Sequence, residues 1–129
     1  MDEKARVLVV DDNPEDVFLI SMILQGAGYE ARSAPDLRWG LHVARTERCD
    51  VVLLDNRFDG SAETGLDSIR KFRGLSSAGV ILMTAFADEK TAQEALLLGA
   101  KGFLAKPVEP GTLLSAVSRL LASLCPSPA

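Results

Sequence analysis

The chain has few of the features that mark several specialised classes of protein. It contains only two cysteines, Cys49 and Cys125, which are too few for a disulfide framework or a zinc site. No apolar run approaches the ~20 residues that a membrane-spanning helix needs, and the first run is too short for a signal peptide. The net charge of −4 at pH 7 argues against nucleic-acid binding, which rewards basic patches. We therefore expect a cytoplasmic protein that binds neither membranes nor nucleic acids.

The length and composition indicate one globular domain. A chain of 129 residues with 47% hydrophobic content is long enough to bury a core of its own. We expect residues 1–125 to form this domain and residues 126–129 to form a frayed tail.

Apolar stretches of strand length alternate with stretches of helical periodicity along the chain. The expected strands are residues 5–10, 29–33, 50–55, 79–83 and 102–105. The expected helices are residues 14 to about 26–28, 36–47, 64–73, 88–98 and 110–124. Strands and helices in strict alternation predict an α/β fold with one parallel sheet covered by helices on both faces.

Several helix features can be read from single residues. Asn13 is an N-cap residue followed by Pro14 at the first helical position. Thr64 and Asp67 have the spacing of a capping box. The apolar run 96–98, Leu-Leu-Leu, lies near the end of the fourth expected helix, and we expect it to face the core rather than a partner.

Polar side chains stand at the ends of four of the expected strands. Asp11 and Asp12 follow the first strand, and Asp55 ends the third. Thr84 follows the fourth strand, and Lys106 follows the fifth. The carboxyl ends of parallel strands share one edge of a sheet, where open α/β sheets bind ligands, so we expect these side chains to lie together. Acids, a hydroxyl and an ammonium group in one place suit a divalent cation bound together with a phosphoryl group.

Taken together, these residues resemble the signature of the response-regulator receiver domain of two-component signalling, over about residues 5–124. The matching positions are Asp11-Asp12, Asp55, Thr84-Ala85 and Lys106-Pro107. The resemblance implies a doubly wound, flavodoxin-like sheet of order 2-1-3-4-5. It also implies phosphorylation of Asp55 in the presence of Mg²⁺ or Mn²⁺ by a sensor histidine kinase or a histidine phosphotransfer protein. Such a domain assists a reaction on its own side chain and is not a turnover enzyme.

The resemblance also assigns roles around the metal ion. It implies that Asp12 and Asp55 ligate the ion directly and that Asp11 acts through water. The backbone carbonyl of Arg57 would add a further ligand. Mg²⁺ suits such a set because it prefers oxygen ligands and keeps several waters. Without a cation the acids repel one another, since two unit charges ~4 Å apart interact by about 4 kcal/mol at an effective dielectric of about 20.

Further implied roles concern the phosphoryl group and the response to it. Lys106 and the Thr84 hydroxyl would contact phosphoryl oxygens, while the small Ala85 leaves the phosphorylated aspartate accessible. A cis peptide bond between Lys106 and Pro107 would aim the lysine at the site. Phe103 would be an aromatic switch that responds to Thr84. The switch would alter the surface of the fourth helix, last strand and last helix, where a downstream protein would bind.

The sequence departs from the family pattern beside the phosphorylated aspartate. The usual proline is absent, and Asp59 stands four residues on from Asp55. The loop that follows Asp55 is about two residues longer than usual for the family. Arg57 and Phe86, two residues past Asp55 and Thr84 respectively, are bulky side chains at variable positions. We expect both to line the approach to the phosphoryl group and to lengthen the life of the phosphorylated state.

Other functions are compatible with the same fold. Each polar side chain has an ordinary explanation, such as a helix cap, a loop acid or a solvated lysine, and only their joint placement favours a site. A pseudo-receiver would be an interaction module that takes no phosphate, but the complete set of acids argues against it. A flavodoxin-like cofactor binder would want a Ser/Thr/Gly-rich loop after the first strand, whereas the acidic loop 11–14 would repel a phosphate without a metal.

The chain ends just after the last expected helix. We therefore expect a receiver that acts by binding another protein or by passing its phosphate on, unless it is a piece of a longer regulator.

Overall fold

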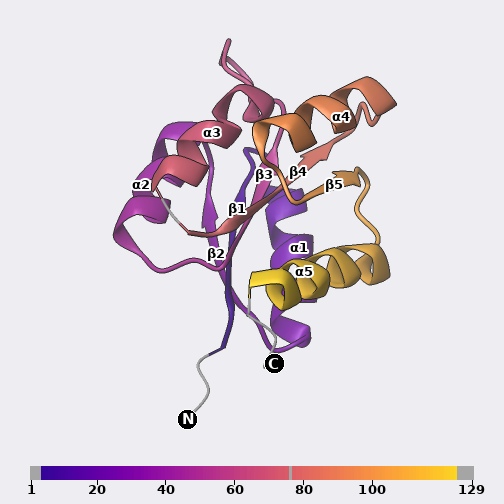
Figure 1. Cartoon of the computed structure of the whole chain (residues 1–129). Coiled ribbons are helices and arrows are strands. Elements are labelled where there is room, and N and C mark those ends of the chain that lie inside the picture. The colour runs from indigo at the N-terminus through magenta and orange to yellow at the C-terminus, as the bar shows by residue number, and fades with distance from the viewer. Residues whose placement is uncertain (1–3, 76, 125–129) are drawn as a thin grey trace.

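The computed structural model describes residues 4–75 and 77–124, and the predicted tail and Cys125 lie outside them (Figure 1). The strands are β1 (Arg6–Val10), β2 (Glu30–Ala34), β3 (Val51–Asp55), β4 (Gly79–Thr84) and β5 (Gly102–Ala105). The helices are α1 (Pro14–Gly26), α2 (Leu37–Thr46), α3 (Gly65–Leu75), α4 (Glu89–Leu98) and α5 (Pro110–Leu124). Every predicted element is present, with ends shifted by at most a few residues.

The strands form one parallel sheet in the order β2-β1-β3-β4-β5, as predicted. The register pairs Val10 with Leu54 across β1 and β3, and Asp55 with Met83 across β3 and β4. Thr84 pairs with Ala105 across β4 and β5. The carboxyl ends of β1, β3, β4 and β5 therefore lie side by side at one edge of the sheet.

Two apolar clusters lie on opposite faces of the sheet. One packs α2, α3 and α4 onto the even-numbered side chains of β1, β3 and β4, and Phe72 is its largest fully buried side chain. The other packs α1 and α5 onto the odd-numbered side chains. The three-layer arrangement is visible in Figure 1, where α1 and α5 lie on one side of the sheet and α2 and α3 on the other. The central strands are buried on both faces, as parallel strands are.

Helix starts follow the local signals of the sequence. The Asn13 side chain accepts hydrogen bonds from the backbone N–H groups of Glu15 and Asp16 at the start of α1. At the start of α3, Thr64 and Asp67 bond each other's backbone N–H groups at 3.0 and 3.1 Å, which is a complete capping box. These caps fix the two helices that flank the carboxyl edge of β1 and β3.

The leucine run of α4 faces the core only in part: Leu98 is half-buried and packs against the apolar cluster under α2, α3 and α4, as expected, but its two neighbours do not. Leu96 and Leu97 are 56% and 84% exposed, and Ala95 is the fully buried residue of this helix. Helix α4 has a 3.6-residue period, and the stripe through Ala95 already faces the sheet, so adjacent leucines are turned outward. Within the described residues, no helix has the length and apolar character needed to cross a membrane.

Candidate functional site: an acidic pocket at the carboxyl edge of the sheet

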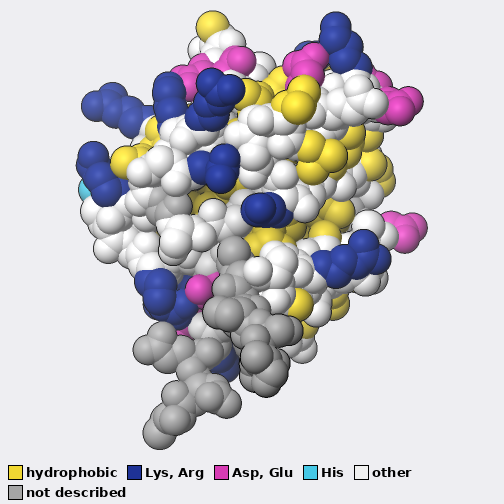
Figure 2. Space-filling model, in the orientation of Figure 1, with side chains coloured by type: hydrophobic (Ala, Val, Ile, Leu, Met, Phe, Trp, Pro, Cys, Tyr) yellow, Lys and Arg dark blue, Asp and Glu magenta, His cyan; other side chains and the backbone are white. Residues whose placement is uncertain are grey.

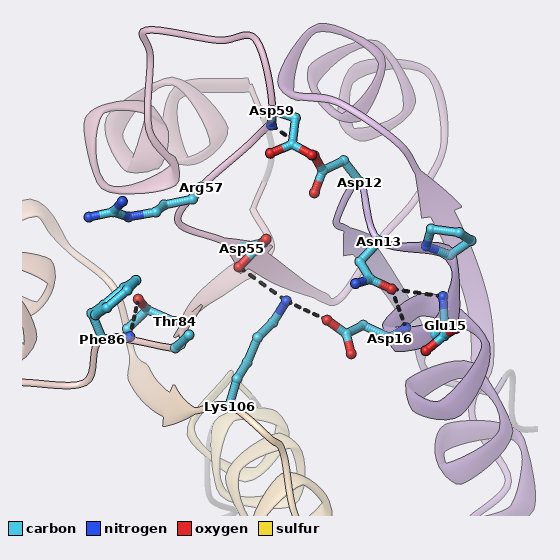
Figure 3. A pocket seen from close by; sticks show the side chains of 12 residues that line it. Asp12, Asn13, Glu15, Asp16, Asp55, Arg57, Asp59, Thr84, Phe86 and Lys106 are labelled. Carbon is cyan, nitrogen blue, oxygen red and sulfur yellow. Dashed lines mark hydrogen bonds and ion pairs between the residues drawn. The ribbon is translucent and has the colours of Figure 1, made fainter.

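The carboxyl edge of the sheet holds a pocket of about 550 Å³. It is formed by the loops after β1, β3, β4 and β5 and by the first turn of α1 (Figure 3). Its lining residues are Asp12, Asn13, Pro14, Glu15, Asp16, Asp55, Arg57, Asp59, Thr84, Ala85, Phe86 and Lys106. The structure therefore brings together the residues that the sequence placed at separate strand ends.

Three acids form the centre of the site. Oxygen atoms of Asp11, Asp12 and Asp55 lie within 4.8 Å of one another. Asp11 and Asp55 are 1% and 7% exposed, whereas Asp12 is half-buried and lines the pocket. Burying two carboxylates this close to a third is costly unless cations or hydrogen bonds compensate for the charge.

Backbone N–H groups orient each of the three acids. Asp11 Oδ1 accepts from the N–H of Asn13 at 2.9 Å, and Asp55 Oδ1 accepts from the N–H of Asn56 at 3.0 Å. Asp12 Oδ2 accepts from the N–H of Asp59 at 2.8 Å. The last bond joins the loop after β1 to the loop after β3. Asp59 stands four residues on from Asp55, in the loop that lacks the family's usual proline. Its N–H thus positions Asp12.

Lys106 brings a positive charge into the same cluster. Its Nζ lies 2.6 Å from Asp11 Oδ2, 2.9 Å from Asp16 Oδ2 and 3.3 Å from Asp55 Oδ1. The Lys106–Pro107 peptide bond is cis. The N–H of Lys106 also donates to the carbonyl of Thr84 at 2.9 Å, so the lysine is fixed to the end of β4.

The charges in the pocket shift two pKa values upward. Burial and the negative charge of Asp11 raise the pKa of Asp55 from 3.8 to about 6, although the ammonium of Lys106 acts in the opposite sense. Burial disfavours the charged form of Lys106, but hydrogen bonds to Asp11 and Asp16 outweigh that cost and raise its pKa above the ordinary value. A raised carboxyl pKa marks an unbalanced negative charge, which a bound cation would relieve.

The donor set fits a hard divalent cation. Three carboxylates whose oxygens converge within 4.8 Å offer the oxygen ligands that Mg²⁺ and Mn²⁺ prefer. Soft ligands are not present in this cluster, since neither histidine nor cysteine belongs to it. Burial and the neighbouring charge of Asp11 raise the pKa of Asp55, and a cation bound to these acids would offset both effects.

The rim of the pocket is formed by two bulky side chains. The guanidinium carbon of Arg57 lies 4.6 Å from the centre of the Phe86 ring, in cation–π geometry (Figure 3). The backbone N–H of Phe86 donates to Thr84 Oγ1 at 3.1 Å. This bond fixes the backbone of Phe86 to the hydroxyl at the end of β4. Phe58 beside Arg57 is buried in the core and anchors this part of the loop.

The two predicted switch residues lie on the same face of the sheet. Phe103 pairs with Leu82 in the register of β4 and β5, and Thr84 is two residues further along β4. Phe103 is half-buried and packs against the apolar cluster under α2, α3 and α4. Side chains two residues apart on a strand point to the same face, so Thr84 and Phe103 both lie on the face of the sheet that α2, α3 and α4 cover.

Sequence reasoning missed two contributions to the site. Asp16 was not expected in the site, although its carboxylate contacts Lys106. Asp16 lies in the first turn of α1, and its contact with the lysine had no signal in the sequence. The hydrogen bond from the Asp59 N–H to Asp12 could not be predicted from the sequence either, because it depends on the path of the loop.

Comparison with known proteins identifies the family. A protein-family model, that of the response regulator receiver domain, matches residues 7–118. The chain belongs to the response regulator receiver domain family. This receiver is 31% identical over 119 residues to Protein PilH of Pseudomonas aeruginosa, a match that covers 92% of the chain and 98% of PilH.

Other relatives are longer than this receiver. It is 32% identical over 114 residues to the DNA-binding response regulator MtrA of Mycolicibacterium smegmatis, which covers 88% of the chain and 49% of MtrA. The chain thus spans about half the length of that relative.

Among solved structures, the receiver resembles the chemotaxis protein CheY4 of Vibrio cholerae with a TM-score of 0.84 and 33% identity, over 92% of this chain and 100% of that one.

Proposed function

We propose that this receiver accepts a phosphoryl group on Asp55 from a phosphohistidine donor, with Mg²⁺ or Mn²⁺ present, and thereby changes its affinity for a partner. The observation that carries the proposal is the position of Asp55. It is a buried carboxylate that lines the pocket, within reach of two other acids and an ammonium group. This surrounding is what a phosphoryl acceptor needs, because phosphoryl transfer depends mainly on positioning and charge stabilisation.

In the proposed reaction, an oxygen of the Asp55 carboxylate attacks phosphorus. A phosphorus–oxygen bond forms as the phosphorus–nitrogen bond to the donor histidine breaks, and the electron pair returns to that nitrogen. A bound divalent cation would neutralise negative charge on the acids and the phosphoryl oxygens. Asp12 and Asp55 would ligate it directly, with Asp11 acting through water and the Arg57 carbonyl as a further ligand.

Residues on the other side of the pocket would hold the phosphoryl group. Lys106 is poised to contact a phosphoryl oxygen, because its ammonium already lies 3.3 Å from Asp55 Oδ1. The Thr84 hydroxyl would donate to another phosphoryl oxygen. Ala85 is exposed and small, so the approach to Asp55 stays open on that side. The receiver works on its own side chain and is not proposed to turn over an external substrate.

The proposed output surface is formed by α4, β5 and α5. A Thr84 hydroxyl drawn toward the phosphate would vacate space on the face of the sheet where Phe103 lies, and the ring could turn inward. Hydrophobic side chains are gathered on the surface over α4 and β5 in Figure 2, and Leu96 and Leu97 of α4 are exposed. Such a patch suits a protein partner.

The proposed partners follow from this chemistry. Upstream, a sensor histidine kinase or a histidine phosphotransfer protein would supply the phosphoryl group. Downstream, a protein would bind the surface of α4, β5 and α5. Nucleic acid and membranes are not proposed as partners of this domain, and its cytoplasmic location stays a prediction.

Binding of a phosphoryl analogue tests the proposal. Beryllofluoride with Mg²⁺ should bind the wild type with one-to-one stoichiometry, measured by ¹⁹F NMR or calorimetry, and should not bind Asp55→Asn. Binding should also fail when Mg²⁺ is withheld. If the wild type binds no analogue while its fold and Mg²⁺ binding are intact, the protein is a pseudo-receiver, an interaction module that takes no phosphate.

A further inference from the structure

Lys106 is shared between the phosphoryl acceptor and a carboxylate on the opposite side of the pocket. In Figure 3 its ammonium lies between Asp55 and Asp16, with one dashed contact to each. The contact with Asp16 is 2.9 Å, and the contact with Asp55 is longer, at 3.3 Å. The Lys106 side chain is 14% exposed and that of Asp16 is 37% exposed, so water screens this pair only in part.

The first turn of α1 holds Asp16 in place for this contact. Its backbone N–H is bonded to the Asn13 side chain at 3.2 Å, as part of the helix cap. Its neighbour Glu15 has the same kind of backbone bond, at 2.9 Å, and lines the same pocket. Among the residues that the structure describes, no ion pair joins the Glu15 carboxylate to Lys106, so the two acids of this turn differ in their contact with the lysine, and Glu15 is also the more exposed.

We propose that Asp16 is a positioning residue that holds the Lys106 ammonium away from Asp55 until the phosphoryl group arrives. The inference rests on the proposed function, because it concerns the same lysine. An ammonium group has three N–H donors, and one of them is directed to Asp16. The phosphoryl group would have to draw Lys106 from Asp16 toward its own oxygens, and the lost ion pair opposes phosphorylation.

Two consequences of removing the Asp16 charge can be separated. One is general: any acid near the pocket repels a phosphoryl group, so removing its charge favours binding of that group. The other is specific: without Asp16, Lys106 keeps its contact with Asp11 at 2.6 Å but loses the one that draws it to the first turn of α1, so it can move closer to Asp55. Glu15→Gln produces the general effect alone, while Asp16→Asn produces both. We therefore expect Asp16 to oppose phosphorylation more strongly than Glu15 does, because Asp16 acts through Lys106 as well as through its charge.

Affinity for beryllofluoride in saturating Mg²⁺ tests the proposal, with wild type, Asp16→Asn, Glu15→Gln and Asp16→Glu compared side by side. Asp16→Asn should bind roughly fivefold more tightly than the wild type, the size expected for loss of one partly screened ion pair. Glu15→Gln should change the affinity by less than half as much on a logarithmic scale. Asp16→Glu keeps the charge within reach of Lys106 and should restore an affinity close to that of the wild type.

A second measurement needs neither metal nor analogue. In the metal-free protein, the ¹⁵N and ¹H resonances of the Lys106 ammonium, detected by lysine ammonium NMR, should shift in Asp16→Asn and stay in place in Glu15→Gln. Equal analogue affinities for Asp16→Asn and Glu15→Gln would overturn the proposal, as would weaker binding by Asp16→Asn. Failure of the wild type to bind the analogue would instead refute the proposed function.

Discussion

At the residue scale, the site is defined by a buried carboxylate whose charge is only partly balanced. Asp55 lines the pocket beside Asp11, and the ammonium of Lys106 lies 3.3 Å from its Oδ1. The ammonium is closer to Asp11 and Asp16 than to Asp55. The metal-free protein therefore holds Asp55 in an unfavourable charge state at neutral pH, with its pKa raised to about 6.

Asp55→Asn should therefore stabilise the metal-free protein at neutral pH. The pKa of Asp55 rises from 3.8 to about 6 on folding, so the folded state holds this proton more tightly than the unfolded state does. Stability should fall as pH rises from about 4 to about 6, and the penalty should be complete above that window. Asp55→Asn should gain roughly 1–2 kcal/mol at pH 7.5, since water at the pocket mouth screens part of the repulsion.

Urea denaturation at pH 4 and pH 7.5, with chelator present, measures this effect. Asp59→Asn is the matched control, because Asp59 lines the same pocket but is exposed. The gain in Asp55→Asn should be largest at pH 7.5 and nearly absent at pH 4. A gain of the same size at both pH values would mean that the charge of Asp55 is not its cause.

Arg57 and Phe86 should lengthen the life of the phosphorylated state. Hydrolysis needs a water in line with the phosphorus–oxygen bond, and correct placement of a nucleophile accounts for several kcal/mol of such barriers. Phe86 offers no hydrogen bond to orient that water, and Arg57 lies over its ring at 4.6 Å. Phe86→Glu combined with Arg57→Asn should lose phosphate roughly tenfold faster, which is about 1.4 kcal/mol of barrier.

Release of inorganic phosphate after rapid removal of the donor measures the rate. If the double variant and the wild type decay together, rim shielding does not set the lifetime.

At the element scale, the start of α3 is pressed against the end of β3. The N–H of Gly65 donates to the carbonyl of Asn56 at 2.9 Å, and the N–H of Leu66 donates to the Asn56 side chain at 2.9 Å. A methyl group on Gly65 would lie 2.1 Å from the carbonyl oxygen of Asp55. Only glycine allows this close approach of two backbones, which places α3 directly against Asp55.

Gly65→Ala should destabilise the fold and disturb the site, whereas Gly74→Ala in the same helix should not. The first change forces the backbones of β3 and α3 apart, at a cost of roughly 1–3 kcal/mol. The second places a methyl group where nothing lies within 4 Å, and it should stabilise the helix by about 0.5–1 kcal/mol. Thermal unfolding gives the first comparison, and Mg²⁺ affinity gives the second. Equal Mg²⁺ affinities in the two variants would show that the contact does not position Asp55.

Helix α4 and strand β5 should carry the response to phosphorylation. Thr84 ends β4 just before the loop to α4, and Phe103 lies on the same face of the sheet one strand away. Beryllofluoride should therefore change amide chemical shifts along α4, β5 and α5 as well as around the pocket. The change is a population shift, because the analogue favours only the state that it contacts better. Thr84→Ala should bind the analogue with a reduced response on that surface. Shifts restricted to α2 and the far end of β2 would contradict this path.

At the scale of the whole molecule, much of the fold could be predicted because local and global signals agree. The apolar runs that become β1, β3 and β4 are buried on both faces, and each is followed by the polar residue that the pocket uses. Parallel strands bring those residues together whatever the details of the loops. The convergence of Asp11, Asp12 and Asp55 follows from this topology.

Other features could not be predicted, because they depend on orientation rather than on order. Lys106 and Asp16 are ninety positions apart in the sequence, and their contact depends on the rotation of α1. The exposure of Leu96 and Leu97 depends on which stripe of α4 meets the sheet. The direction of Arg57, whose guanidinium lies over the Phe86 ring, depends on the path of the loop that follows β3.

The central claim is that Asp55 takes the phosphoryl group. Incubation with a small-molecule phosphodonor and Mg²⁺, followed by intact-mass spectrometry, tests it most directly. The account predicts the addition of one phosphoryl group to the wild type, none to Asp55→Asn, and none to the wild type when Mg²⁺ is chelated. Equal labelling of Asp55→Asn and the wild type would contradict the assignment.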